Sequence, residues 1–141
     1  MSCYPATGKW GIVYFRKKAS TAFTANNLVA FETNGGSGDP IEPADASDTL
    51  LLGIGLKPVA STDSDYASNT RIPVAVPLEK FAEFECDTVS GTLVVADEGL
   101  EVDLSDAASV NRAASSTDVL TCTRFISATK GRFTINLPVI S

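Results

Sequence analysis

The sequence contains no histidine, only three cysteines and no long apolar run. Without histidine, the chain cannot form a Ser–His–Asp or Cys–His nucleophile, an H-E-x-x-H zinc site or a histidine general base. No stretch reaches the ~18–20 consecutive apolar residues that a helix needs to cross a bilayer. Residues 1–11 lack the basic start and apolar run of a signal peptide. We therefore expect a protein that stays where it is made or leaves inside a larger particle.

The three cysteines, Cys3, Cys86 and Cys122, are far apart in the sequence and form no C-x-x-C pair. Their spacing predicts neither a zinc site nor an iron–sulfur cluster, and an odd number is a poor disulfide framework. We expect reduced, structural thiols. A catalytic cysteine is disfavoured because no histidine is present to activate it.

The 141 residues are 44% hydrophobic and 20% charged, which suits one domain with a core. The formal net charge of −6 is uneven, since residues 19–121 hold all 17 acids against four bases and so carry −13. The two ends carry seven basic residues and no acid, which gives +7: Lys9, Arg16, Lys17, Lys18, Arg124, Lys130 and Arg132. Either the ends meet an acidic surface, or these residues are scattered on exposed strands.

Apolar residues recur at every second position in most of the chain, which is the period of a strand with one buried face. In residues 72–78 the apolar positions alternate with others that include Pro73 and Pro77. Because proline cannot donate to a sheet ladder, we expect 72–78 to be an edge strand. Glycines 53 and 55 indicate a bulge or a close approach of another backbone. Further strands are predicted at 12–15, 28–32, 50–56, 83–88, 93–96, 100–104, 119–126 and 132–140.

About nine strands with almost no helical pattern predict an all-β barrel or sandwich. Residues 107–115 are the one place for a turn or two of helix. We expect residues 1–11 to be an N-terminal arm and residues 12–141 to be a single compact β domain. The glycine-rich segment 35–38 lacks the lysine of a phosphate-binding loop and is expected to be a flexible hairpin loop.

The densest acidic cluster comprises Asp97, Glu98, Glu101, Asp103 and Asp106. Carboxylates this close can bind Ca²⁺, or one of them can serve as an acid catalyst with a raised pKa. The alternating pattern places Glu101 and Asp103 on the solvent side of a strand, and no EF-hand loop is present. We therefore expect a solvated acidic face, without a metal or a cofactor.

Nucleic-acid binding is disfavoured by the pI of about 4.5. Near the N-terminus, basic residues alternate with aromatic ones as in stacking platforms: Lys9, Trp10, Tyr14, Phe15, Arg16, Lys17 and Lys18. The strand alternation nevertheless assigns most of these rings to the core. Small, polar loops without an evident active site favour an interaction or architectural module.

Seven segments carry a resemblance to a known family. They are 22–31 (AFTANNLVAF), 41–45 (IEPAD), 52–56 (LGIGL), 60–67 (ASTDSDYA), 73–77 (PVAVP), 94–99 (VVADEG) and 127–135 (SATKGRFTI). In this order they resemble the capsid decoration proteins of tailed bacteriophages, which are also called head-stabilising or cement proteins. The resemblance covers about residues 12–140.

This resemblance implies a compact β-barrel or β-tulip-like subunit with no catalytic residue. Such a subunit is made in the bacterial cytoplasm and sits on the capsid exterior of the virion, often as a homotrimer bound to the major capsid protein, without nucleic acid or membrane. An N-terminal arm would reach neighbouring capsid subunits. We therefore hypothesise that five residues lie on the capsid-facing side: Lys9, Trp10, Arg16, Lys17 and Lys18.

Two other readings stay open. A small ligand-binding or glycan-binding barrel would use its Ser/Thr/Asp loops, where Tyr66 is the evident ring, and another head or tail accessory role is compatible with the same features. An enzyme would need two carboxylates, such as Glu83 or Glu85 with Asp97 or Glu101, held ~5–10 Å apart. The alternation exposes most of these acids, so the enzyme is the least favoured reading.

Overall fold

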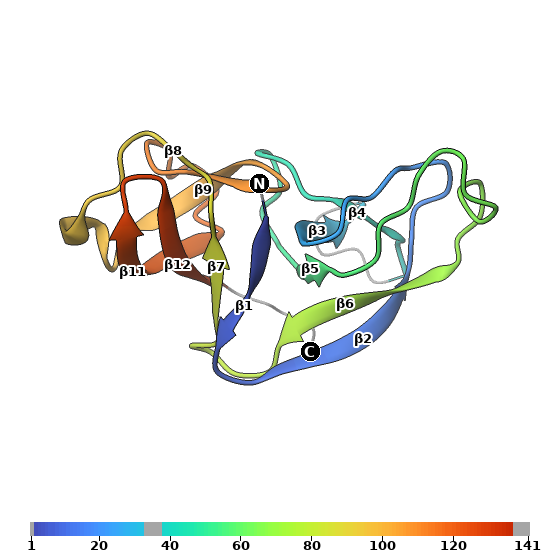
Figure 1. Ribbon diagram of the computed structural model, residues 1–141, viewed down its shortest axis with the longest axis horizontal. Helices are drawn as coiled ribbons and strands as arrows, with labels where there is room; N and C mark the ends of the chain where they lie inside the picture. Colours follow the sequence, from blue (N-terminus) through green and yellow to red (C-terminus); the bar gives the residue numbers. More distant parts are fainter. Residues whose placement is uncertain (1, 33–37, 137–141) are drawn as a thin grey trace.

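The computed structural model describes residues 2–32 and 38–136, and these residues form an all-β fold of two open sheets (Figure 1). Within these residues the one helical element is a 3₁₀ turn, η1 (Val95–Asp97). The same part of the chain contains no helix long and apolar enough to cross a membrane. The all-β prediction is confirmed, but neither sheet closes into a barrel over the described ranges.

The larger sheet has seven strands in the order β1-β7-β12-β11-β9-β10-β8. Its strands are β1 (Cys3–Thr7), β7 (Glu83–Cys86), β8 (Val89–Ser90), β9 (Glu101–Asp106), β10 (Ser109–Asn111), β11 (Leu120–Ser127) and β12 (Lys130–Ile135). Neighbouring strands are antiparallel except β8 and β10, which are parallel. As the alternation predicts, Phe84 and Cys86 of β7 point into the core, where Phe84 packs against Phe133 at a centroid distance of 6.0 Å.

The smaller sheet has five antiparallel strands in the order β2-β6-β5-β3-β4. Its strands are β2 (Trp10–Arg16), β3 (Asn27–Phe31), β4 (Ile41–Pro43), β5 (Gly53–Gly55) and β6 (Arg71–Pro77). The outermost strand, β2, keeps an unbroken register with β6 over all seven of its residues. Its outer side therefore forms the longer edge of this sheet.

The main hydrophobic core draws side chains from both sheets. Leu28 and Ile54 of the five-stranded sheet belong to the same cluster as Phe84, Leu104 and Phe133 of the seven-stranded sheet. A second cluster covers the opposite face of the five-stranded sheet and contains Phe23, Val29, Ile41, Leu52, Val59, Ile72, Val74 and Val76. The centre of the five-stranded sheet is thus buried on both faces, which explains its continuous apolar stretches such as 28–30.

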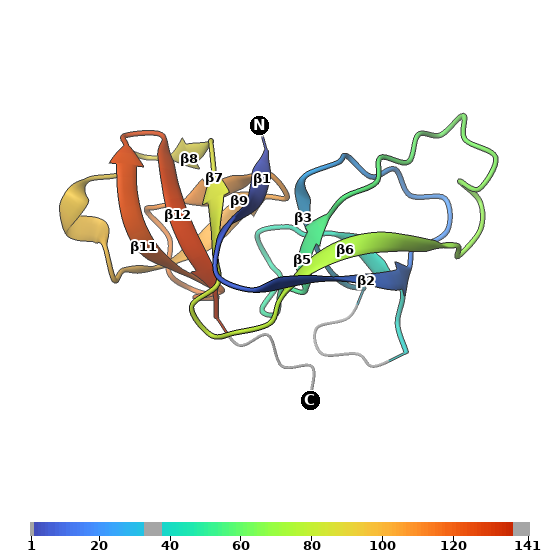
Figure 2. The same cartoon turned by 60° about the horizontal axis from the view of Figure 1, so that its bottom comes forward.

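The N-terminal segment joins the two sheets, whereas the sequence placed it in an arm outside the domain. Residues 3–7 form β1, which pairs with β7, and the carboxylate of Asp87 accepts hydrogen bonds from Ser2 N (2.8 Å) and Ser2 Oγ (3.2 Å). The chain then turns at Gly8, where φ is +80° and a Cβ would lie 2.7 Å from the Cα of Ala82. From this turn it enters β2 in the other sheet (Figure 2).

The prediction that residues 72–78 form an edge strand is wrong, because β6 lies between β2 and β5. The carbonyl of Pro73 accepts a hydrogen bond from Leu56 N (3.1 Å), so Pro73 faces the β5 side. Pro77 faces the same side, since alternate residues of a strand point the same way. Strand β5 pairs only with Val74 and Ala75 of β6. Pro73 and Pro77 lie outside this pairing, so their lack of an N–H group removes no hydrogen bond between β5 and β6.

Several other local predictions are corrected by the structure. Residues 93–96, expected as a strand, overlap η1, and residues 109–111 within the expected helical turn form β10. The end of the predicted strand 132–140 lies outside the described residues beyond Asn136. The close approach expected near Gly53 is confirmed, since a Cβ there would lie 2.1 Å from the carbonyl oxygen of Ala75.

Candidate interaction surface

The five residues predicted to face a capsid lie on β2 or next to its ends, but in different environments. Lys9 and Arg16 are exposed at the two ends of the strand. Trp10 is half-buried against the main core, and its indole Nε1 donates to the carbonyl of Thr7 (2.9 Å). The guanidinium of Arg16 donates to the carbonyl of Gly38. These three residues remain on the surface of the five-stranded sheet.

Lys17 is fully buried, so it cannot contact a partner. Its ammonium donates to the carbonyls of Tyr66 (3.1 Å) and Ser68 (2.5 Å), and Asn69 Nδ2 donates back to the carbonyl of Lys17 (2.8 Å). Because a buried ammonium must be hydrogen-bonded, Lys17 fixes the loop between β5 and β6 onto the end of β2. Its role is structural, contrary to the sequence hypothesis.

The ammonium of Lys18 is paired with acids of its own chain. It lies 3.2 Å from Glu32 and 3.2 Å from Glu42, and these carboxylates raise the pKa of Lys18. The same pattern holds at the other basic end, where Glu85 pairs with Lys130 (3.1 Å) and Arg132 (3.3 Å). Three of the seven basic residues near the chain ends, Lys18, Lys130 and Arg132, are therefore paired with acids of the same molecule.

Between Lys9 and Arg16, β2 exposes an apolar surface. The exposed fraction is 63% for Ile12, 41% for Val13 and 58% for Tyr14. The sequence assigned most of the aromatic rings of this segment, Tyr14 among them, to the core, because it could not show that β2 lies at the edge of its sheet. We call residues 10–16, with their exposed side chains and outer backbone, the β2 edge.

The backbone of β2 alternates between the neighbouring strand and the outside. The carbonyl of Lys9 accepts a hydrogen bond from Leu78 N (2.9 Å), and Lys17 N donates to the carbonyl of Thr70 (2.9 Å). Odd-numbered residues therefore face β6, and the N–H and C=O groups of Ile12 and Tyr14 point away from it. Sheet edges are usually protected by charge, proline, a bulge or short length. Residues 10–15 contain no charge, proline or bulge, and their outer backbone accepts a long hydrogen bond from Arg71 Nη1 at the carbonyl of Tyr14 (3.4 Å).

Only part of the aromatic segment belongs to the core. Phe15 packs edge-on against Phe31 with ring centroids 5.9 Å apart, next to the second hydrophobic cluster. Tyr14 remains exposed on the other side of the strand. The interleaved basic and aromatic residues therefore do not form one continuous stacking surface.

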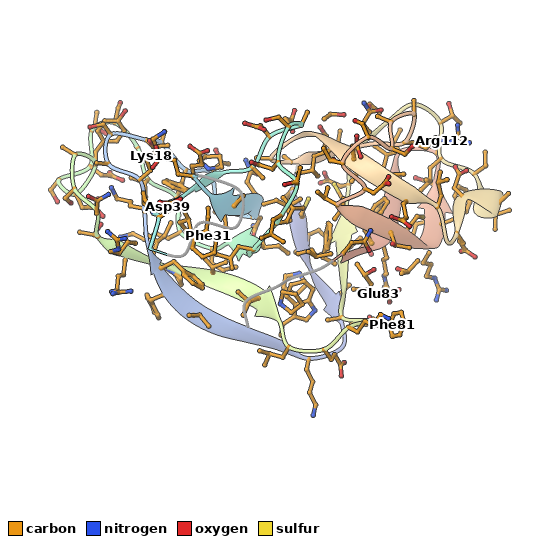
Figure 3. The ribbon with its side chains drawn as sticks, turned by 180° about the vertical axis from the view of Figure 1, so that it is seen from behind. Lys18, Phe31, Asp39, Phe81, Glu83 and Arg112 are labelled. Atoms are coloured by element: carbon orange, nitrogen blue, oxygen red, sulfur yellow. The ribbon has the colours of Figure 1, made fainter. Side chains whose placement is uncertain are left out.

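A second exposed apolar group adjoins the β2 edge at the connection between β6 and β7. Leu78 and Phe81 are exposed by 62% and 70%, and the side chain of Leu78 lies over Gly11, where an added Cβ would be 3.0 Å from Leu78 Cδ1. A depression of about 590 Å³ opens here, lined by Leu78 and Phe81 on one side and by threonines of β11 and β12 on the other. Figure 3 shows Phe81 pointing outward near Glu83.

The acidic cluster is only in part the solvated face that the sequence predicted, since Glu98, Glu101 and Asp106 are exposed but Asp97 and Asp103 are buried. Asp103 is buried, and its carboxylate accepts four hydrogen bonds of 2.8–3.0 Å from the segment 116–118. Burial alone would raise the pKa of Asp103, but the hydrogen bonds from Asp118, Ser116 and Thr117 outweigh it and leave the pKa below its ordinary value. Asp103 is therefore an ionised structural residue.

Asp97 is also used within the fold. Both of its carboxylate oxygens accept hydrogen bonds of 2.9 Å from Arg112, which lies at the opposite end of the molecule from Lys18 (Figure 3). Arg112 lowers the pKa of Asp97, and Val94 N donates a further hydrogen bond. Among the described residues no group of three or more acids, cysteines or histidines is placed to hold a metal ion.

The three cysteines are buried and not disulfide-bonded. Burial raises the pKa of Cys122 to about 11, which suits an inert thiol. Tyr66, the ring expected in a ligand-binding loop, is half-buried against the second hydrophobic cluster. Phe81 is the more accessible ring.

Comparison of the chain with protein-family profiles, with curated proteins and with solved structures returned no match. The β2 edge and the sequence resemblance therefore remain as the two indications of function.

Proposed function

We propose that this chain is a non-enzymatic structural protein of a tailed-phage virion, which binds the outer surface of the capsid and stabilises the head. The observation that supports the proposal is the β2 edge, a seven-residue strand that exposes Ile12, Val13 and Tyr14 and directs part of its backbone away from its own sheet. An unprotected edge of this kind is suited to adding a strand from another chain. We propose that this other chain is the major capsid protein.

The distribution of charge on the β2 edge supports an acidic partner surface. Lys9 and Arg16 lie at the two ends of the apolar segment, and both are exposed. Leu78 and Phe81 extend the apolar area beyond the strand. A capsid strand bordered by acids would bury the apolar residues and neutralise the two bases.

We further propose that the open two-sheet arrangement serves as the β-tulip-like subunit of a homotrimer on the capsid exterior. Three copies would present three β2 edges to the shell at once. Because linked contacts raise the overall affinity without new interactions, a modest contact per subunit suffices to hold the trimer and reinforce the shell.

Co-sedimentation with undecorated heads of the phage that encodes this chain tests the proposal. Wild-type protein is expected to pellet with the heads, whereas Ile12→Asp and Tyr14→Asp should weaken binding by about tenfold or more, because each places a charge in an apolar interface. The matched control is Val95→Asp, since Val95 is 65% exposed but lies on η1, away from β2. This control should bind like the wild type.

Two outcomes would contradict the proposal. Wild-type protein that stays in the supernatant at both low and high salt would exclude capsid binding. Equal loss of binding in Ile12→Asp and Val95→Asp would exclude the β2 edge as the contact. Circular dichroism of every variant confirms that the fold is intact before binding is compared.

A ligand-binding module is the second candidate, favoured by the exposed ring of Phe81 beside the threonine-lined depression. Soluble oligosaccharides that bind the isolated protein, and whose binding is lost in Phe81→Ala but kept in Ile12→Asp, would favour this function over capsid binding.

A further inference from the structure

Cys3 and Cys86 lie directly opposite each other on the neighbouring strands β1 and β7. The backbone N–H of Cys3 points away from β7, because it donates to the carbonyl of Asn26 (2.8 Å). The next contact between the two strands is from Asp87 N to the carbonyl of Ser2 (3.2 Å). Cys3 and Cys86 therefore occupy a non-hydrogen-bonded pair of the antiparallel ladder.

This position has the geometry that a disulfide needs. In a non-hydrogen-bonded antiparallel pair the Cα atoms are about 4.5 Å apart, with side chains on the same face of the sheet. Disulfides join cysteines whose Cα atoms are roughly 4.4–6.8 Å apart. A pair of this kind lies at the lower end of this range, so a disulfide requires little movement of either strand.

The two side chains also point to the same place. Cys3 Sγ and Cys86 Sγ lie 4.0 Å and 3.4 Å from the carbonyl oxygen of Ala108, and the two thiols are hydrogen-bonded to each other. This hydrogen bond raises the pKa of Cys3 and lowers that of Cys86, so Cys86 is the better nucleophile of the pair. Both side chains are fully buried.

We propose that Cys3 and Cys86 are a disulfide-forming site, which closes in oxidising surroundings and leaves Cys122 as the single free thiol. Because both thiols are buried, the exchange requires β1 to open locally. With glutathione disulfide as oxidant, the Cys86 thiolate then attacks one sulfur and releases one glutathione. The Cys3 thiolate then attacks the mixed disulfide at Cys86 and releases the second. The two cysteines lose two electrons and two protons in total, and one glutathione disulfide becomes two glutathione molecules.

The cross-link would hold the N-terminal strand to the seven-stranded sheet. It would close the long loop from residue 3 to residue 86, and long loops lose the most unfolded-state entropy when they are closed. It also lies just before the Gly8 turn into β2, so it would fix the point where the chain passes between the sheets. We expect the oxidised protein to melt about 10 °C above the reduced protein.

The test is thiol–disulfide equilibrium of the full chain in glutathione buffers, approached from reduced and from oxidised protein. Alkylation and intact-mass measurement give the fraction oxidised, and peptide mapping identifies the linked cysteines. We expect a 3–86 link whose effective concentration is about 100-fold higher in native protein than in denatured protein. The variant Cys122→Ser should behave like the wild type, and Cys3→Ser or Cys86→Ser should form no intramolecular link.

An effective concentration no higher in the native than in the denatured chain would overturn the proposal. So would a dominant link through Cys122, or an oxidised protein that melts below the reduced one. None of these measurements involves a capsid, so they stand or fall independently of the proposed function.

Discussion

The two sheets differ in how their edges are protected. In the seven-stranded sheet the charges are matched internally, as in the pairs of Glu85 with Lys130 and Arg132, and the edge strand β8 has only two residues. Its other edge, β1, carries a proline and is tied to β7 through side chains as well as backbone. In the five-stranded sheet, β2 is long and apolar along its free side. The exposed apolar edge, and not the total charge, therefore marks the surface available to a partner.

The largest expected effect tests the internally matched charges of the seven-stranded sheet. Replacing Asp103 by alanine removes the acceptor of four hydrogen bonds from residues 116–118 and leaves three buried or half-buried backbone N–H groups without it. We expect Asp103→Ala to lower the free energy of unfolding by about 3 kcal/mol at pH 7, measured by urea denaturation. The neighbouring Glu101 is exposed, so Glu101→Ala should change it by less than about 0.5 kcal/mol.

The contribution of Asp103 should also depend on pH. Its pKa is lower in the folded protein than in the unfolded chain, where it is about 3.9. The stabilisation is therefore complete above the unfolded-state pKa and is lost as the pH falls through the folded-state pKa. Wild type and Asp103→Ala should converge in stability as the pH is lowered from 5 toward 2. A constant difference over this range would contradict the assignment.

A smaller effect on the free energy of unfolding is expected at the end of β2, where Lys17 and Lys18 are adjacent. Lys17→Met removes the buried ammonium that donates to Tyr66 and Ser68 and should cost about 2 kcal/mol of unfolding free energy. Lys18 is half-exposed, and exposed ion pairs contribute little. Lys18→Met should therefore change stability by less than about 0.5 kcal/mol. Equal effects of the two substitutions would contradict the buried role of Lys17.

The sequence pattern predicted where the strands lie in the chain better than it predicted which strands are adjacent in the sheets. The period-two pattern located β6, β7, β9 and β12, because their apolar residues recur at alternate positions, and the β-branched and aromatic residues of 119–126 located β11. It could not place β6 inside a sheet, since that depends on β5 stopping after three residues. The burial of Asp103 was not predicted for a related reason. Alternation gives the side of the strand to which a residue points, but the turn at 116–118 that covers that side comes from elsewhere in the chain.

The candidate site was predicted only in part. The sequence drew attention to residues 9–18 through their basic charge, and the structure keeps Lys9 and Arg16 on the surface while burying Lys17. The apolar residues between them were missed because both faces of β2 are apolar, which is also the pattern of a central strand. The absence of any charged side chain from 10 to 15 indicates either a central strand or an uncovered edge, and only the sheet order distinguishes the two.

Amide hydrogen exchange along β2 gives the finest distinction, with no expected change in global stability. The N–H groups of Val13 and Phe15 face β6, whereas those of Ile12 and Tyr14 point away from it. We therefore expect slow exchange at the two odd positions and fast exchange at the two even ones, resolved residue by residue by NMR. Binding of a partner strand should slow the even positions, because their N–H groups would then join a ladder.

Slow exchange at Ile12 and Tyr14 in dilute protein that sediments as a monomer would mean that the edge is already covered by its own chain. If the same protein sediments as a dimer, the protection would instead assign the β2 edge to contacts between copies of this chain.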